Sequence, residues 1–257
     1  MSRSAATQRE DTALESLVGR SARVSPGRIE AYGPHPDQRI EWYASGGSSG
    51  APLVFVHGGY FRPAIDRSHA RVTAAALAVE LAAPVLLVEY RRVSGQPEAA
   101  VADIHAISDL LEGLDDEPSV WVGHSAGGAL ALQRAFDPIR PAVPTVALAP
   151  IADLRAAVVD RLGDGAVVAW LGARRAAKPS RYAHLDPARL ALESPERLDR
   201  VVCLHGVDDR VVPPSQSADS GLAYELVAGA HHYDLIDPVS PAWPAVVAAI
   251  RRAISQP

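Results

Sequence analysis

Short apolar segments alternate with longer mixed segments along most of the chain. The apolar segments span residues 38–44, 52–58, 84–90, 119–125, 144–150, 200–206 and 223–230, and several are continuously apolar. Continuous apolar strands are typical of sheets that are covered on both faces. Between them, segments 68–82, 98–114, 126–136 and 242–254 are rich in Ala and Leu with charges at helical spacing. The alternation predicts an α/β fold, with a mostly parallel central sheet of about seven to eight strands and helices on both faces.

Two regions depart from this pattern. Residues 1–30 are polar and mixed, which predicts an N-terminal tail with one short helix around residues 12–18. Residues 31–257 form a single predicted domain, within the size range of one hydrophobic core. Inside it, residues 151–200 contain short helix-like pieces that are interrupted by Pro179, Pro187 and Pro195. We expect this segment to form a small helical cap over the strand ends.

Composition and charge narrow the classes of partner. The net charge of −5 disfavours a surface for nucleic acid or anionic membranes. No segment is as long and apolar as a membrane helix, and the N-terminus does not resemble a signal peptide, so a cytoplasmic location is expected. Cys203, the single cysteine, lies in an apolar run and is predicted to be a buried core residue in a reducing compartment. No His, Cys or Asp set has metal-ligand spacing, so neither a metal nor another cofactor is expected.

A serine stands at the junction of a predicted strand and a predicted helix. Residues 123–128 read Gly-His-Ser-Ala-Gly-Gly, directly after an apolar strand. One interpretation is a glycine-rich turn in which Ser125 caps the helix. The other is a nucleophile on a strained turn, where Gly123 and Gly127 remove collisions that side chains would cause. In a parallel sheet, ligands bind at the carboxyl ends of the strands, and Ser125 is predicted to lie there.

An acid and a base follow this serine, each on a loop after its own strand. A serine hydroxyl is a poor nucleophile at neutral pH, and it needs a base that a third group orients. Asp208 and Asp209 follow the strand at 200–206, and His231 and His232 follow the strand at 223–230. The order serine, acid, histidine fits a catalytic triad.

Backbone donors for a developing oxyanion are predicted on another loop. Gly58 and Gly59 follow the strand at 52–58, and their backbone can approach a ligand closely. The N–H groups of Gly59 and Tyr60, with that of Ala126, are the predicted donors, and Gly58 is the alternative on the first loop. His57 and His124 are expected to be structural residues that anchor these loops.

These motifs together resemble the α/β-hydrolase superfamily from about Glu30 onward. Its pattern H-G-x-x-D-x-x-V-P, counted from His205, implies Asp209 as the acid and Asp208 as a turn residue. The family's histidine followed by an aromatic residue implies His232 as the base, with His231 where glycine is common.

Finer resemblances point to the branch of arylformamidases (kynurenine formamidase-like enzymes) and bacterial carboxylesterases. They rest on residues 57–62 (HGGYFR), 122–128 (VGHSAGG), 32–43 and 88–104. The chain differs from hormone-sensitive-lipase-like esterases at His124, where they carry Asp, and at Tyr60, where they carry a third glycine.

The resemblance implies a serine hydrolase that cleaves a small ester or activated amide through an acyl-enzyme. The predicted substrate pocket comprises Phe61, Trp170, Tyr182, His231 and Tyr233, together with Tyr60. For Trp170 and Tyr182, the alternative is that they pack the cap against the body of the domain. Two alternatives stay open: the same triad in a lactonase, thioesterase or cyclase, and a non-catalytic protein that binds a small ligand. The sequence indicates no oligomeric state.

Overall fold

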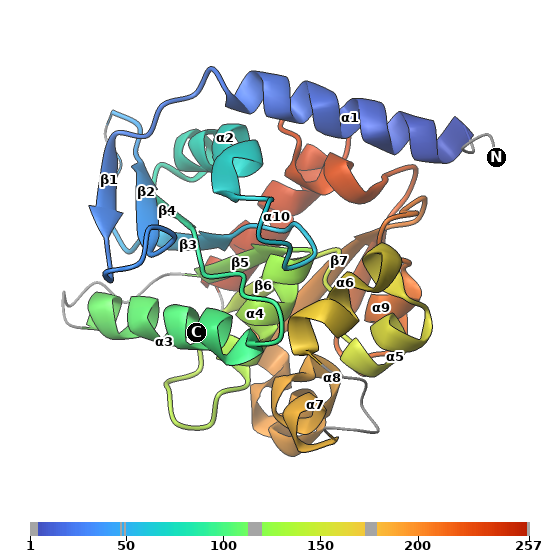
Figure 1. The fold of residues 1–257 in the computed structure, drawn as a ribbon. Coiled ribbons are helices and arrows are strands. Elements are labelled where there is room, and N and C mark those ends of the chain that lie inside the picture. Colours follow the sequence, from blue (N-terminus) through green and yellow to red (C-terminus); the bar gives the residue numbers. More distant parts are fainter. Residues whose placement is uncertain (1–4, 47, 49, 113–119, 173–178, 256–257) are drawn as a thin grey trace.

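The computed structural model describes residues 5–46, 48, 50–112, 120–172 and 179–255. Within them, eight strands form one sheet in the order β1-β2-β4-β3-β5-β6-β7-β8 (Figure 1). The strands are β1 Arg28–Ala31, β2 Arg39–Tyr43, β3 Leu53–Val56, β4 Val85–Val88, β5 Val120–His124, β6 Thr145–Leu148, β7 Val201–Gly206 and β8 Tyr224–Val227. In this spatial order, every pairing from β4 to β8 is parallel. Strand β2 pairs with β4 on one side and with β1 on the other, and both of these pairings are antiparallel. The predicted α/β fold and its mostly parallel sheet are confirmed.

Helices cover both faces of the sheet. The long helices of the body are α2 Arg71–Leu81, α3 Pro97–Glu112, α4 Ala126–Ala135 and α10 Trp243–Ser255. One core cluster joins α2 and α10 to Leu53 and Phe55 of β3, and a second joins α3 and α4 to the intervening Val54 and Val56. Because successive side chains of a strand point to opposite faces, β3 is buried along its whole length, which explains its continuous apolar run. The last two residues of the predicted helix 98–114, and Ser119 of the predicted strand 119–125, lie outside the described residues.

The N-terminal region contains more structure than the sequence pattern predicted. Helix α1, Ala5–Ser21, is 17 residues long and packs against the body. Leu17 is fully buried, and Arg20 Nη1 lies 2.7 Å from Asp237 Oδ1. The apolar residues of this helix, Leu14, Leu17 and Val18, form only a narrow face among polar ones, so the mixed composition concealed it. Strand β1 was also not predicted, because it is an exposed edge strand.

The segment between β6 and β7 is a helical insertion, called the insertion below. It contains α5 Leu154–Val159, α6 Leu162–Leu171, α7 Pro179–Leu185, α8 Pro187–Glu193 and the 3₁₀ helix η2 Pro195–Arg200. Pro179, Pro187 and Pro195 each stand first in a helix, where the missing N–H costs nothing. Cys203 in β7 is fully buried. Among the described helices, none is long and apolar enough to cross a membrane.

Strand register places the loops that carry the candidate site residues beside one another. Val56 at the end of β3 pairs with Gly123 of β5, so the loop after β3 lies next to the turn that contains Ser125. Gly206 at the end of β7 pairs with Val227 of β8, so the loops that carry the predicted acid and base are also neighbours. All four loops follow carboxyl ends of parallel strands, where ligands of such sheets bind.

Candidate active site

Ser125 lies on a strained turn between β5 and α4. Its φ of 56° and ψ of −119° are unfavourable for a residue with a side chain. The turn is held by the Ser125 N–H, which donates to the Leu148 carbonyl at 2.9 Å. The Ser125 carbonyl accepts from the N–H groups of Ala129 and Ile151, each at 3.2 Å. Strain that the surrounding structure enforces in this way is typical of functional positions.

The glycines around Ser125 are required by close backbone packing. A Cβ on Gly127 would lie 2.2 Å from the Val56 carbonyl oxygen, and one on Gly123 would lie 2.3 Å from the Gly127 oxygen. Real Cβ contacts are not this short, so α4 can begin against the end of β3 only with glycine at these positions. The positions of the glycines around Ser125 thus follow from the close approach of α4 to the strands β3 and β5.

His232 and Asp209 form a buried pair. His232 begins η3 (His232–Ile236), after β8, and its Nδ1 lies 2.7 Å from Asp209 Oδ2. The other oxygen, Asp209 Oδ1, accepts from the N–H groups of Val211 (2.9 Å) and Val212 (2.8 Å). The carboxylate is therefore fixed by two backbone donors while it holds the imidazole.

The neighbours of this pair face elsewhere. Asp208 is exposed, and its N–H donates to the Ala230 carbonyl. His231 is buried beside Asp234, to whose Oδ2 its N–H donates at 2.8 Å. The contact between the two loops therefore involves the second residue of each adjacent pair, Asp209 and His232.

A third histidine, which the sequence analysis missed, contacts the same carboxylate. His205 Nε2 lies 3.4 Å from Asp209 Oδ2 and 2.9 Å from the Val212 carbonyl, and its Nδ1 lies 2.7 Å from Ser217 Oγ. Burial raises the pKa of Asp209, but His232 and His205 together lower it further, so the net pKa lies well below its usual value. The group is ionised at neutral pH. A polar residue at the end of the apolar strand 200–206 was the available signal.

The loop after β3, residues 57–62, was predicted from the sequence to carry donors for an oxyanion, and it is called the oxyanion loop below for that reason. It lies against Ser125, because a Cβ on Gly58 would be 2.9 Å from the Ser125 Cβ. In the part of the chain that is described, the N–H groups of Gly59, Tyr60 and Ala126, and that of the alternative donor Gly58, donate to no other protein group. Unpaired donors therefore lie on both backbone segments that meet at the serine.

Two buried histidines support these segments, as the sequence analysis predicted for His57 and His124. His57 Nδ1 lies 2.6 Å from the Gly58 carbonyl, and its Nε2 lies 3.1 Å from Glu89 Oε1. His124 Nε2 lies 3.2 Å from the His232 carbonyl, and burial lowers the pKa of His124 well below its usual value. His124 therefore ties the serine turn to the loop of His232 as a neutral imidazole.

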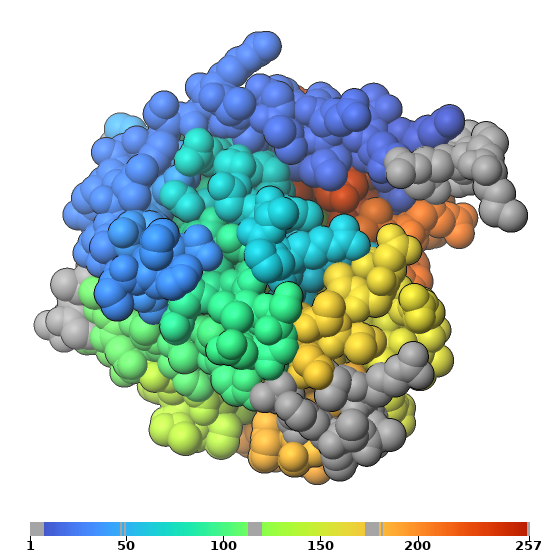
Figure 2. Space-filling view, in the orientation of Figure 1, coloured from blue at the N-terminus to red at the C-terminus, as the bar shows by residue number. Residues whose placement is uncertain are grey.

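A cavity of about 390 Å³ connects the parts of the site. Ser125, His232, Tyr60 and Tyr233 line it, together with Leu14 and Val18 of α1. Among the described residues, no hydrogen bond joins Ser125 Oγ to His232, although both line this cavity. On the molecular surface, the blue α1, the cyan segment around residues 60–70 and the yellow insertion meet on one face (Figure 2).

Most of the predicted pocket residues do not line this cavity. Tyr60 and Tyr233 do, but Phe61 and Trp170 are buried and stack on each other, with ring centroids 3.8 Å apart. Tyr182 is buried at a different cavity, beside Asp153 and Asp186, and His231 is turned toward Asp234. Phe61, Trp170 and Tyr182 belong to one buried core cluster, in which their large apolar area is removed from water.

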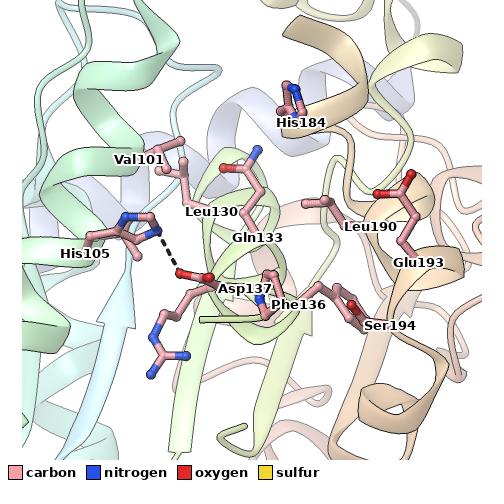
Figure 3. A pocket seen from close by; sticks show the side chains of 13 residues that line it. Val101, His105, Leu130, Gln133, Phe136, Asp137, His184, Leu190, Glu193 and Ser194 are labelled. Atoms are coloured by element: carbon pink, nitrogen blue, oxygen red, sulfur yellow. Dashed lines mark ion pairs between the residues drawn. The ribbon is translucent and has the colours of Figure 1, made fainter. Parts of the chain in front are cut away.

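A cavity of about 330 Å³ lies away from the site, between α3, α4 and the insertion (Figure 3). Its polar lining includes His105, whose Nε2 lies 3.2 Å from Asp137 Oδ2. None of the site residues predicted from the sequence lines it. Within the described ranges, no group of three or more His, Cys, Asp or Glu side chains could hold a metal ion.

The chain belongs to the alpha/beta hydrolase family, whose model matches residues 53–254. A curated relative, the dihydrolipoyllysine-residue acetyltransferase component of the acetoin cleaving system from Pseudomonas putida, is 28% identical over 222 residues. The match covers 78% of this chain and 56% of that protein, so this chain spans just over half the relative's length.

Solved structures show the same fold at low sequence identity. An esterase/lipase from an uncultured bacterium is 20% identical, with a TM-score of 0.63 over 95% of this chain and 99% of that one. The hyperthermophilic esterase of the archaeon Pyrobaculum calidifontis is 19% identical, with a TM-score of 0.66 over 97% and 92%. A truncated carbohydrate esterase from gut microbiota is 13% identical, with a TM-score of 0.69 over 91% and 99%. The arrangement of elements is thus shared with these proteins.

Proposed function

We propose that this protein is a serine hydrolase that cleaves a small ester or activated amide through an acyl-enzyme intermediate. The observation that carries the proposal is that Ser125, on its strained turn, and His232, which is paired with Asp209, line one cavity. A nucleophile, a base and a group that orients the base are the parts that acyl transfer needs.

In the first half of the reaction, His232 Nε2 accepts the proton of Ser125 Oγ as that oxygen attacks the substrate carbonyl carbon. Asp209 holds Nδ1–H at 2.7 Å, which leaves Nε2 as the basic nitrogen and stabilises the imidazolium that forms. The negative charge on the carbonyl oxygen is received by the N–H groups of Gly59, Tyr60 and Ala126. Collapse breaks the bond to the alcohol or amine, which takes the proton from His232.

In the second half, water attacks the acyl group on Ser125, and His232 accepts the proton of that water. The same three N–H groups stabilise the second tetrahedral intermediate. Its collapse returns the proton to Ser125 Oγ and releases the carboxylic acid. These steps use water and groups of this chain alone.

The cavity supports a compact substrate. Its volume of about 390 Å³ is at the lower end of the range for small-molecule sites. Leu14, Val18 and Ile65 give it an apolar wall, which suits an aliphatic or aromatic group beside the scissile carbonyl. The finer resemblance to arylformamidases makes N-formyl arylamines the first amides to test beside short esters.

The test is covalent labelling with a fluorophosphonate, followed by turnover of a substrate panel. We expect Ser125 to be labelled, and the Ser125→Ala variant to show neither labelling nor turnover of p-nitrophenyl acetate. The panel includes N-formylkynurenine, a lactone and a thioester, because each presents a carbonyl that the same triad can attack. A folded protein whose Ser125 is not labelled would contradict the proposal and favour a ligand-binding role.

A further inference from the structure

Three consecutive residues of the oxyanion loop have a left-handed backbone. The φ angles are 124° at Gly59, 53° at Tyr60 and 56° at Phe61. Glycine adopts positive φ readily, whereas two successive aromatic residues do not. The conformation that presents the Gly59 and Tyr60 N–H groups beside Ser125 is therefore not the intrinsic preference of this segment. Contacts outside the loop must hold it.

Helix α6 of the insertion supplies several of those contacts, and the Tyr60 hydroxyl adds another by donating to the Val211 carbonyl. The ring of Phe61 stacks on Trp170 with a centroid distance of 3.8 Å and an interplanar angle of 6°. Gly163, in the left-handed stretch at the start of α6 (φ 60°), fits against the ring of Tyr60, because a Cβ there would lie 2.7 Å from a ring carbon. Arg62 Nη2 donates to the Gly163 carbonyl at 2.7 Å. Each of the residues 60, 61 and 62 thus meets α6.

Helix α6 is itself fixed to the body of the domain. The Gly95 N–H, in the loop after β4, lies 2.9 Å from the Ala169 carbonyl and 3.0 Å from that of Trp170. Val167, Trp170 and Leu171 are buried in the cluster that also contains Ala126. Helix α6, which contacts the oxyanion loop, and Ala126, which follows Ser125, thus belong to the same core cluster.

We propose that α6 positions the oxyanion loop, with Trp170 as the principal positioning residue acting through Phe61. This inference rests on the proposed serine hydrolase function, because the loop has a catalytic task only if an oxyanion forms. Trp170 does not line the cavity of Ser125, so its effect falls on the transition state more than on substrate binding. Without the stack, the loop relaxes from its left-handed conformation and withdraws its donors.

The experiment compares Trp170→Ala with Trp170→Phe, which keeps an aromatic partner for Phe61. Val159→Ala is the matched control, because Val159 lies in the same insertion but is 76% exposed. For p-nitrophenyl acetate, we expect kcat of W170A to fall about 30-fold while KM changes less than threefold. W170F and V159A should stay within a few-fold of wild type. The inhibition constant of a trifluoromethyl ketone, whose adduct carries an oxyanion, should rise in W170A in parallel with the loss of kcat.

A second variant changes the oxyanion loop through Tyr60 instead of Phe61. Gly163→Ala places a methyl group against the ring of Tyr60 and should show the same pattern, which matters if W170A does not fold. Circular dichroism and the melting temperature establish which variants are folded. The inference is overturned if folded W170A and G163A keep kcat within twofold, or if kcat falls with no change in ketone affinity. Absence of fluorophosphonate labelling in the wild type would instead overturn the proposed function.

Discussion

His205 and His232 contact the same atom, Oδ2 of Asp209, at 3.4 Å and 2.7 Å. Only His232 lines the cavity, whereas His205 is fully buried at the end of β7. The two rings together hold the carboxylate in its ionised form and fix the direction from which it faces His232.

His205→Asn should lower kcat roughly tenfold with little change in KM, because the carboxylate loses one of its fixed partners while the cavity is untouched. Steady-state kinetics on p-nitrophenyl acetate measure this. Ser217→Ala removes a different hydrogen bond of the His205 ring and should have a smaller effect. Equal kcat in H205N and wild type would show that Asp209 is held sufficiently by Val211 and Val212.

Asp209→Asn should reduce kcat by about three to four orders of magnitude, because an amide cannot hold His232 in the productive tautomer. Asp208→Asn is the matched control, since Asp208 is adjacent but exposed, and it should remain within twofold of wild type. A larger loss in D208N than in D209N would reverse the assignment of the acid.

Val18→Trp should narrow the cavity from the side of α1. The expected result is a loss of about tenfold in kcat/KM for p-nitrophenyl hexanoate relative to the acetate ester, since a bulky side chain at the wall discriminates by size. Val79→Trp, at a position 68% exposed on α2, controls for a surface tryptophan. If both variants keep the wild-type ratio between the two esters, α1 does not set acyl size.

His69 should make the protein less stable in acid. Burial, with His57 acting in the same direction, lowers the pKa of His69 to about 4 in the folded state. Below pH ~6.5 the unfolded chain binds a proton that the folded ring does not, so the free energy of unfolding falls as the pH drops from ~6.5 toward 4. Urea unfolding measures the free energy of unfolding at pH 7 and at pH 5. Its decrease between these two pH values should be smaller in His69→Gln than in wild type, by roughly 1–2 kcal/mol. His35→Gln, at a half-exposed ring, should keep the wild-type drop.

Gly127→Ala should destabilise the fold by about 3 kcal/mol, because the added methyl group meets the backbone of β3, which cannot move aside. Gly19→Ala on α1 is the control, since no atom lies within 4 Å of its added Cβ. That change should stay within about 1 kcal/mol of wild type or stabilise the helix slightly. Similar melting temperatures for the two variants would contradict the packing account of the motif.

The sequence was most informative where the signal is local. Ser125 and its glycines occupy consecutive positions, and a buried parallel strand is apolar at every residue, so these features can be read from short segments. Features that depend on packing between distant segments could not be read in this way. Phe61 and Trp170 are 109 positions apart, and their residue types fit a pocket as well as a core stack. Similarly, nothing local to α1 indicates that Leu14 and Val18 reach the cavity.

Helix α1 lies outside the region that matches the family model, residues 53–254, yet it contacts three segments around the site. Arg20 pairs with Asp237 beyond η3, Glu10 accepts from the Arg210 N–H next to Asp209, and Ser21 donates to the His69 carbonyl. A protein trimmed to the shared region would lose Leu14 and Val18 from the apolar wall while keeping Ser125, Asp209 and His232. Under the proposed function, substrate preference and bond-breaking chemistry therefore depend on separate parts of the chain, so α1 can be changed to alter the first without changing the residues of the second.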